Sequence, residues 1–201
     1  MVHLRPFRSG DEPALAEICL RTADAGADGT GILEDDDIWA AVFVLPYVER
    51  HPHLAFVVET DDGRVAGYAV ATDDTDAFEE WFRTGWWPRA GARWPRRASA
   101  EEAPTRQDRV LAYADGRRPG AEPFARRFPA HLHIDLLPEL QGQGWGRRLI
   151  AALTDALRAE GVAGVHLVAA GGNTGAIAFY ERLGFTRLDA PDDVAAFGMA
   201  L

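Results

Sequence analysis

Cysteine is nearly absent from this chain of 201 residues, and the chain contains no long run of apolar residues. The single cysteine, Cys19, excludes a disulfide within the chain and is typical of proteins in a reducing compartment. Because no stretch approaches the roughly 20 apolar residues of a membrane span, we expect no transmembrane helix. The residues from Met1 to Pro6 lack the apolar core of a secretory signal, and we therefore predict a cytoplasmic protein.

An excess of basic residues is also missing. Arginine and lysine together number 21, against 31 aspartate and glutamate residues, which gives a net charge of −10. No basic stripe is visible, so we expect no nucleic-acid partner, and the lack of a long apolar run leads us to expect no membrane partner. An acidic surface would instead attract a cationic partner. The apolar content of 47% is ordinary for a globular protein, and we predict one domain over residues 1–201 with an insertion at about 73–128.

The stretch from Ile134 to Leu157 predicts a buried strand, a glycine-rich turn and an amphipathic helix. The strand covers Leu132 to Leu137 and ends at Pro138, which cannot donate a backbone hydrogen bond. The turn is Gln141-Gly142-Gln143-Gly144-Trp145-Gly146, and the helix from Arg147 to Ala159 carries an apolar stripe. Free amides at the start of a helix, together with the helix dipole, form an anion site that most often holds phosphate.

Two common phosphate-binding loops do not match this turn. A dinucleotide fold requires G-x-G-x-x-G, but Arg147 stands where the third glycine belongs. The G-K-S/T of a P-loop is absent. The pattern Gln141-x-x-Gly144-x-Gly146 instead resembles the R/Q-x-x-G-x-G/A loop of the GCN5-related N-acetyltransferase (GNAT) family, which cradles the pyrophosphate of acetyl-CoA. An ordinary tight turn between strand and helix would give the same pattern without a ligand.

A second motif follows in the order that this family requires. The segment from Asn173 to Phe185 resembles the family's N-x-x-A-x-x-F/L-Y-x-x-x-G-F pattern, with Asn173 suited to cap a helix and Gly184 suited to end it. The chain is thus identified as a member of the family. The resemblance implies an α/β fold with a mixed, mostly antiparallel sheet flanked by helices. A narrower resemblance is to bacterial acetyltransferases related to the acetyltransferase-like domain of some O-GlcNAc hydrolases.

Other strands are expected on both sides of these motifs. Val2 to Phe7 predicts a short strand, and Leu54 to Glu59 with Arg64 to Thr72 predicts a hairpin in which Gly67 marks a bulge or a close backbone approach. Val162 to Ala169 predicts the strand after the long helix, and Val194 to Leu201 predicts a last strand that closes the sheet.

The resemblance also implies roles for the matching residues. It predicts acetyl-CoA as the co-substrate and no metal. Tyr180 matches the tyrosine that protonates the departing thiolate in many relatives. The central strand is expected to separate from its neighbour near Leu136 and Leu137. The expected coenzyme-binding residues are Leu136, Leu137, Gln141, Gly142, Gln143, Gly144, Trp145, Gly146, Arg147, Asn173 and Phe179.

Three polar residues alternate along the central strand. His131, His133 and Asp135 therefore point to one face of the predicted sheet. If that face lines the cleft, Asp135 or His133 can act as the general base, directly or through water. Buried side chains that hydrogen-bond to one another would give the same pattern. A His-x-His-x-Asp strand also has the ligand types of a metal site, although the family resemblance implies none.

The acceptor is expected near an acidic run at residues 34–37, which favours a helix N-terminus. In this family the corresponding region borders the acceptor cleft. Asp35, Trp39 and Tyr47 are therefore candidates for holding a small-molecule or peptidyl amine. The alternative is a helix whose acidic first turn is merely solvated.

The insertion contains four of the six tryptophans, with predicted helices at Ala77 to Trp87 and at Pro104 to Asp115. Arginine pairs such as Arg117-Arg118 are expected to be solvated or to pair with acidic residues. The tryptophans would close a lid over the cleft or form a homodimer contact, and we favour a folded cap on the core. They are Trp81, Trp86, Trp87 and Trp94.

The predicted activity is the transfer of an acetyl group from acetyl-CoA to a primary amine by direct attack in a ternary complex. An amine attacks a thioester without a covalent enzyme intermediate, so no nucleophilic serine or cysteine is needed. The alternative is a catalytically silent acyl-CoA-binding module that recognises a protein partner through the tryptophan-rich insertion.

Overall fold

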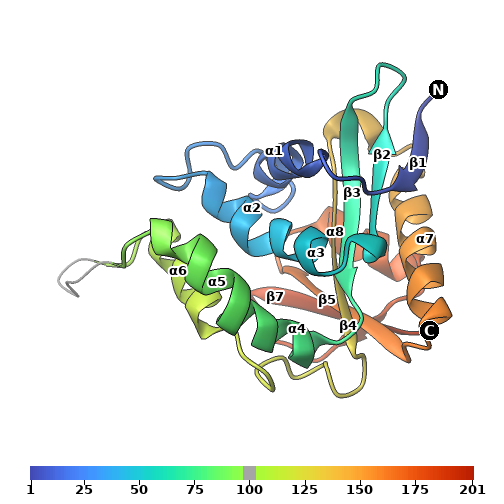
Figure 1. Cartoon of the computed structure of the whole chain (residues 1–201). Helices are drawn as coiled ribbons and strands as arrows, with labels where there is room; N and C mark the ends of the chain where they lie inside the picture. Colours follow the sequence, from blue (N-terminus) through green and yellow to red (C-terminus); the bar gives the residue numbers. More distant parts are fainter. Residues whose placement is uncertain (97–102) are drawn as a thin grey trace.

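The alternating apolar residues of the chain build one mixed sheet. The computed structural model describes residues 1–96 and 103–201, so residues 97–102 of the predicted insertion lie outside the described part. Within these residues, seven strands pair in the order β1-β2-β3-β4-β5-β7-β6 (Figure 1). Every neighbouring pair is antiparallel except β4 and β5. The strands are β1 (His3–Pro6), β2 (Ala55–Glu59), β3 (Val65–Thr72), β4 (Ala130–Leu136), β5 (Gly164–Ala170), β6 (Thr186–Leu188) and β7 (Val194–Ala200).

Helices cover the sheet on both faces. Helix α7 packs on β2, β3 and β4, and helices α1 and α3 also pack on β3. Figure 1 shows these two groups on opposite sides of the strands. No helix among the described residues is long and apolar enough to cross a membrane. The helices are α1 (Glu12–Thr22), α2 (Asp37–Phe43), α3 (Leu45–Arg50), α4 (Thr75–Trp81), α5 (Trp87–Ala90), α6 (Arg106–Gly116), α7 (Trp145–Ala159) and α8 (Thr174–Arg182).

The parallel contact between β4 and β5 is very short. The two strands pair only at Ala130 with Val165 and at His131 with His166. Strand β4 nevertheless stays paired with β3 along its length, and β5 stays paired with β7. The two halves of the sheet therefore separate after His131. The divergence therefore begins earlier in β4 than the expected position near Leu136.

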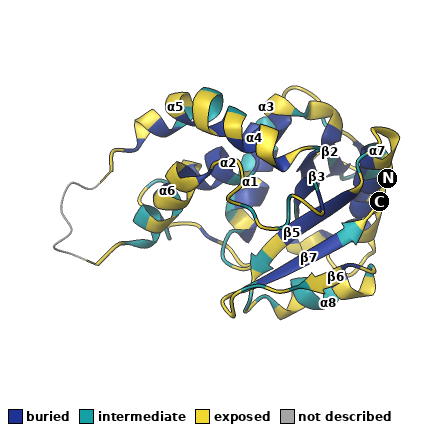
Figure 2. Ribbon diagram, turned by 90° about the horizontal axis from the view of Figure 1, so that it is seen from below, coloured by how far each residue is buried: buried dark blue, intermediate teal, exposed yellow. Residues whose placement is uncertain are grey.

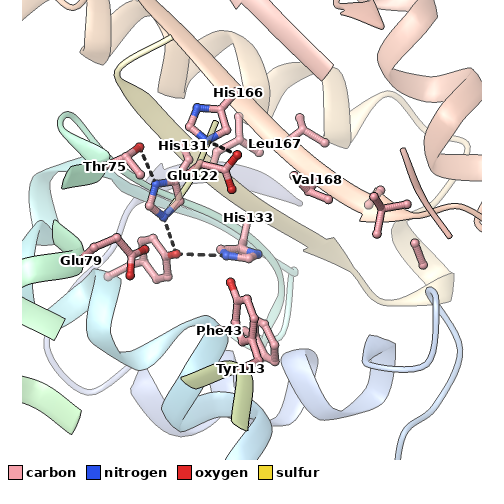
Figure 3. A pocket seen from close by; sticks show the side chains of 15 residues that line it. Phe43, Thr75, Glu79, Tyr113, Glu122, His131, His133, His166, Leu167 and Val168 are labelled. Carbon is pink, nitrogen blue, oxygen red and sulfur yellow. Dashed lines mark hydrogen bonds and ion pairs between the residues drawn. The ribbon is translucent and has the colours of Figure 1, made fainter. Parts of the chain in front are cut away.

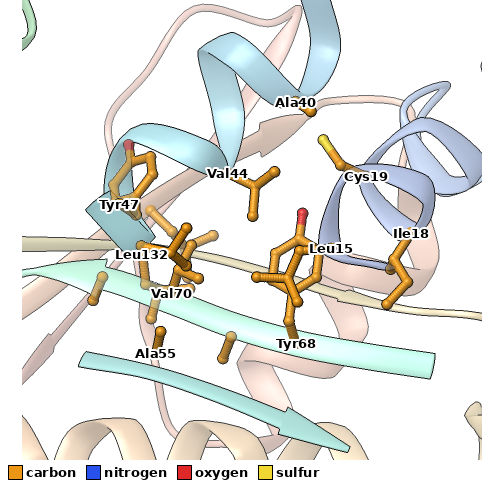
Figure 4. Packing of buried hydrophobic residues seen from close by; sticks show 14 of the residues in the cluster. Leu15, Ile18, Cys19, Ala40, Val44, Tyr47, Ala55, Tyr68, Val70 and Leu132 are labelled. Carbon is orange, nitrogen blue, oxygen red and sulfur yellow. The ribbon is translucent and has the colours of Figure 1, made fainter. Parts of the chain in front are cut away.

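The core extends over both faces of the sheet, and one part of it lies between α1, α3 and the central strands. Leu15, Tyr47, Tyr68 and Val70 are fully buried there (Figure 4). In Figure 2 the central strands are largely dark blue, whereas the outer faces of the helices are exposed. Gly67 lies at the predicted bulge, because the pairing of β2 with β3 shifts from Val58 with Gly67 to Glu59 with Val65, and a Cβ atom at Gly67 would also overlap the side chain of Leu136 on β4.

Most predicted elements are confirmed to within about two residues, with two informative differences. Thr186–Leu188 forms the edge strand β6, which no pattern predicted because three residues are too few to show alternation. Strand β7 consequently lies inside the sheet, between β5 and β6, instead of closing its edge.

The tryptophan-rich segment is attached to the rest of the chain through its indole groups. Trp86 Nε1 donates to the carbonyl of Ala41 in α2 at 2.8 Å. Trp87 Nε1 donates to Asp115 of α6 at 2.7 Å. Buried indoles need such partners. The first bond ties the segment from α4 to α6 to α2, and the second joins α5 to α6 within the segment.

A buried ion pair lies under this segment. Arg117 donates to both carboxylate oxygens of Glu79, at 2.7 and 2.8 Å, and the two side chains are 4% and 10% exposed. The Arg117 guanidinium also donates to the Val42 carbonyl at 3.1 Å and lies 4.0 Å from the centroid of the Phe82 ring. Of the two expectations for Arg117, solvation or pairing with an acidic residue, the second describes its position, but the pair lies in the interior.

Replacing Glu79 by glutamine should lower the free energy of unfolding by about 3–5 kcal/mol, because Arg117 would be left buried without its counter-charge. Urea denaturation at pH 7 measures the change. Glu80→Gln is the matched control, since Glu80 pairs with Arg83 on the surface and should contribute less than about 1 kcal/mol. An equal loss in the free energy of unfolding of the two variants would contradict the burial of Arg117 as the cause of the loss in Glu79→Gln.

Candidate active site

Two cavities lie along β4 beyond the point where it leaves β5. The first, which we call the loop cavity, has a volume of about 700 Å³ and is lined by the end of β4, the loop before α7 and helix α8. The second, the histidine cavity, has a volume of about 330 Å³ and is lined by residues of α3, α4, α6, β4 and β5 (Figure 3). They adjoin, because His133 lines the histidine cavity and the next residue, Ile134, lines the loop cavity.

The loop cavity presents a series of backbone donors. Gly142 and Gly144 adopt φ angles of +73° and +81°, conformations that glycine reaches without strain. Within the described part of the chain, the amides from Gly142 to Arg147 donate no backbone hydrogen bond. The last three of these belong to the first turn of α7, where helical geometry leaves amides free and the dipole is positive. This arrangement suits an anion with several oxygens, such as a diphosphate.

Side chains hold this loop in place. Gln141 Nε2 donates to the carbonyl of Leu136 at 2.9 Å, and Gln143 Nε2 donates to the carbonyl of Glu139 at 2.5 Å. Gly146 serves a different purpose, since a Cβ atom there would lie 2.9 Å from Cζ of Phe179. The absence of a side chain at Gly146 therefore lets α7 and α8 approach each other across the cavity.

Helix α8 forms the opposite wall. Its N-cap is Asn173, as predicted, whose Oδ1 accepts from the amide of Ala176 at 3.0 Å. The ring of Tyr180 packs between Phe185 and Phe197, at centroid distances of 5.5 Å to each. Burial and the nearby charge of Asp135 raise the pKa of the Tyr180 hydroxyl above its ordinary value. The hydroxyl therefore stays protonated and can donate a proton into the loop cavity.

Asp135 lies on the loop-cavity side. The Tyr68 hydroxyl donates to Asp135 Oδ2 at 2.5 Å. Burial raises the pKa of the Asp135 carboxyl from 3.8 to about 6, so the group changes charge close to neutral pH.

The histidine cavity brings together residues that are far apart in the sequence. The Tyr47 hydroxyl lies 2.6 Å from His131 Nε2 and 3.1 Å from His133 Nε2. Burial, and after it the positive charge of Arg117, lowers the pKa of both imidazoles, that of His133 to about 3. Both histidines are therefore neutral at physiological pH.

Several predicted site residues lie in these cavities and several do not. Of the expected coenzyme-binding residues, Leu137 and Gln143 do not line the loop cavity. Asp35 accepts from Trp94 Nε1 at 2.8 Å, and Trp39 is buried. Both lie outside the two cavities, and their proposed contact with an acceptor stays a prediction.

Other cavity residues were missed by the sequence analysis. Thr75, Glu79, Tyr113 and Glu122 come from the predicted insertion, where no motif identified them, and His166 comes from β5. A polar residue inside a predicted buried strand was the one signal that could have pointed to His166. Among the described residues, no group of three or more histidine, cysteine or acidic side chains is arranged to hold a metal ion.

The comparison with known proteins defines the class. The model of the acetyltransferase (GNAT) family matches residues 25–185. The chain therefore belongs to this family, and its fold is the GNAT fold that the two motifs predicted.

Individual relatives agree with that assignment. The crystal structure of SsHAT is 38% identical to this chain, covers 99% of it and 98% of SsHAT, and superimposes with a TM-score of 0.93. The structure of yncA from Salmonella typhimurium with its cofactor acetyl-CoA is 18% identical over 100% of this chain and 94% of yncA, with a TM-score of 0.58, a likeness of fold alone.

A curated relative matches over a shorter region. The mycothiol acetyltransferase of Streptosporangium roseum is 52% identical over 52 residues, which are 26% of this chain and 15% of that protein. The match therefore spans only a small part of that relative's length. The narrower resemblance to acetyltransferases related to O-GlcNAc hydrolases stays a prediction.

Asp135→Asn should stabilise the protein at neutral pH. Because the folded pKa lies above the unfolded value, the folded state binds more protons between pH 3.8 and about 6, and the contribution of this group to stability falls as pH rises. The loss of stability that comes from burying the ionised Asp135 carboxylate is complete above pH 6 and amounts to at most about 3 kcal/mol. Thermal unfolding should therefore show a higher Tm for the variant at pH 7.5 and no gain at pH 4.

The exposed Asp189 provides the control for this experiment. Asp189→Asn should change the Tm by the same small amount at both pH values. A gain for Asp135→Asn that is equal at pH 4 and pH 7.5 would contradict burial of the carboxylate as its cause.

Proposed function

We propose that this protein transfers the acetyl group of acetyl-CoA to a primary amine by direct attack in a ternary complex. The observation that carries the proposal is the run of backbone N–H groups from Gly142 to Arg147 that donate no backbone hydrogen bond. They belong to the loop cavity, which adjoins the histidine cavity along β4. The first cavity suits the diphosphate and arm of the coenzyme, and the second suits the acceptor. The binding of acetyl-CoA by yncA supports the same assignment.

The site can hold a polyanion despite a net charge of −10. Local donors act at contact distance, whereas the charges of the remaining surface are screened beyond about 8–10 Å. Arg147 and Arg182 also line the loop cavity. Beyond His131, the edge of β4 that faces β5 has no strand partner, so its peptide groups are available to the amides of a pantetheine arm.

The bound coenzyme supplies an activated thioester. A cationic amine first releases one proton to water. The neutral nitrogen then forms a bond to the carbonyl carbon while the carbon–sulfur bond breaks, and the nitrogen loses its second proton to a base. Asp135 and His133 are the two candidates for this base. The Tyr180 hydroxyl, kept protonated by burial, donates a proton to the departing sulfur.

The acceptor enters through the histidine cavity in this proposal. Its rim includes Tyr113 and Val168, which are 53% and 44% exposed. Glu122 lines the same cavity and lies 4.0 Å from His166. Glu79 is already paired with Arg117, so Glu122 is the carboxyl group of this cavity that would attract a cationic amine, either a small molecule or the end of a peptide.

Turnover with a panel of primary amines tests the proposal. Thiol release from acetyl-CoA should depend on the amine, and calorimetry should detect acetyl-CoA binding. All 21 basic residues are arginine, so the chain has no lysine side chain that could consume the acetyl group and imitate turnover. Tight binding without turnover on any amine would favour the silent acyl-CoA-binding module, and the absence of binding would refute both.

Tyr180→Phe should reduce kcat by about 100-fold or more, because the thiolate would leave without a proton. Its Kd for acetyl-CoA should stay within about twofold of the wild-type value, since the ring remains. Steady-state kinetics and calorimetry measure the two quantities. Glu181→Gln, at an exposed neighbouring position on α8, is the control and should behave as wild type. Unchanged kcat in Tyr180→Phe would remove this residue from the mechanism.

A further inference from the structure

We infer that Thr75, His131 and Tyr47 form a hydrogen-bond chain that fixes His133 as its Nε2–H tautomer and leaves Nδ1 of His133 as the base for the acceptor amine. The inference rests on the proposed function and decides between the two candidate bases. In it, His133 is the catalytic residue, and the other three are positioning residues that act through it.

The chain starts at a backbone carbonyl, which can only accept. The amide and the hydroxyl of Thr75 both donate to the carbonyl of Pro129, at 2.8 and 2.7 Å. The single hydroxyl proton is used in that bond. Thr75 Oγ1 lies 2.9 Å from His131 Nδ1 and must therefore accept, which places a proton on Nδ1 of His131.

The next two contacts follow from this proton. His131 is buried and neutral, so its Nε2 carries a lone pair. The Tyr47 hydroxyl, 2.6 Å away, is thus the donor to His131 Nε2. The proton of Tyr47 is then used, and the contact of 3.1 Å between Tyr47 and His133 requires Nε2 of His133 to donate.

Arg117 closes the remaining position on the tyrosine oxygen. Its Nη2 lies 3.4 Å from the Tyr47 hydroxyl oxygen, and guanidinium groups only donate. Glu79 holds the guanidinium in place through two hydrogen bonds. The Tyr47 oxygen therefore gives one hydrogen bond and receives two, which leaves no alternative direction for the contact with His133.

Nδ1 of the neutral His133 is left with a lone pair. No residue in the described ranges forms a hydrogen bond with this atom, and it is not among the fully buried polar atoms that lack a partner. His133 lines the histidine cavity (Figure 3), and its Nδ1 is the ring nitrogen that is not used in the contact with Tyr47. Asp135 lines the other cavity and already accepts from Tyr68.

The proton transfer balances without another reactant. As the amine nitrogen bonds to the carbonyl carbon it becomes strongly acidic, so a weakly basic imidazole can accept its proton at Nδ1. The imidazolium then carries a proton on each nitrogen and passes the new one to water in the open cavity. The low pKa of His133 keeps the lone pair available over the whole working range of pH.

Long-range ¹H–¹⁵N NMR of the full chain labelled on histidine nitrogen tests the inference at pH 7.5. The wild type should show His133 with its proton on Nε2 and His131 with its proton on Nδ1. Replacing each of the six histidines by glutamine in turn assigns the signals. A proton on Nδ1 of His133 in the wild type would overturn the inference whatever the activity of the protein.

Thr75→Val and Thr75→Ser form a matched pair. Valine removes the hydroxyl at nearly constant shape, so the Nδ1–H form of His131 should no longer dominate and kcat should fall about tenfold or more, with the Kd for acetyl-CoA within about twofold. Serine keeps the hydroxyl and should therefore restore the Nδ1–H form of His131, the Nε2–H form of His133 and the rate. Unchanged tautomers in Thr75→Val would overturn the chain. If Thr75→Val does not fold, Tyr47→Phe serves the same purpose through the tautomer of His133.

His133→Gln separates this inference from the proposed function. Glutamine cannot act as a base, and kcat should fall about 100-fold or more, while Asp135→Asn should keep the larger part of the rate. The opposite order of losses would assign the base to Asp135 and overturn the inference while the proposed function stands. If no amine supports turnover in the wild type, both the proposed function and the base role of His133 fail.

Discussion

The short contact between β4 and β5 is the constraint on which the rest of this structure depends. Two residue pairs join the strands, whereas β4 remains paired with β3 from Thr72 to Gly67 and β5 remains paired with β7 over its full length. Because each strand is held by its other neighbour, the sheet opens without either strand losing its shape. The opening exposes peptide groups of β4. Two adjoining cavities lie along this strand, one lined by His133 and the other by Ile134.

The second requirement is the insertion between β3 and β4. It supplies Thr75, Glu79 and Tyr113 to the histidine cavity, and its buried pair of Glu79 and Arg117 reaches the Tyr47 hydroxyl. Desolvating two charges is costly, and hydrogen bonds from the guanidinium to Glu79 and Val42 offset that cost. Of the tryptophans in this insertion, Trp86 donates to Ala41 of α2 and Trp87 donates to Asp115 within the insertion, while the folded cap, the lid and the dimer contact stay predictions.

The loop cavity was predictable because its signals are local. Left-handed glycines, an asparagine cap and a proline at the end of a strand each act through neighbours within a few residues, so Gly142, Gly144 and Asn173 are where the motifs placed them. Two of the residues expected to hold an acceptor carried no such signals. Asp35 and Trp39 were chosen from a family position, but Asp35 bonds to Trp94, which lies 59 residues away in the sequence.

Sequence alone determined which residues alternate along β4, where the glycine-rich turn lies and how α8 begins, because strand periodicity and turn chemistry are properties of short segments. It placed His131, His133 and Asp135 on one face of the sheet. Only the tertiary structure decided that Asp135 lines one cavity and the two histidines another, since that depends on where β4 leaves β5. It also decided that Tyr47 meets His131 across 84 residues of chain, because long-range packing, and no local pattern, sets which hydroxyl reaches which ring.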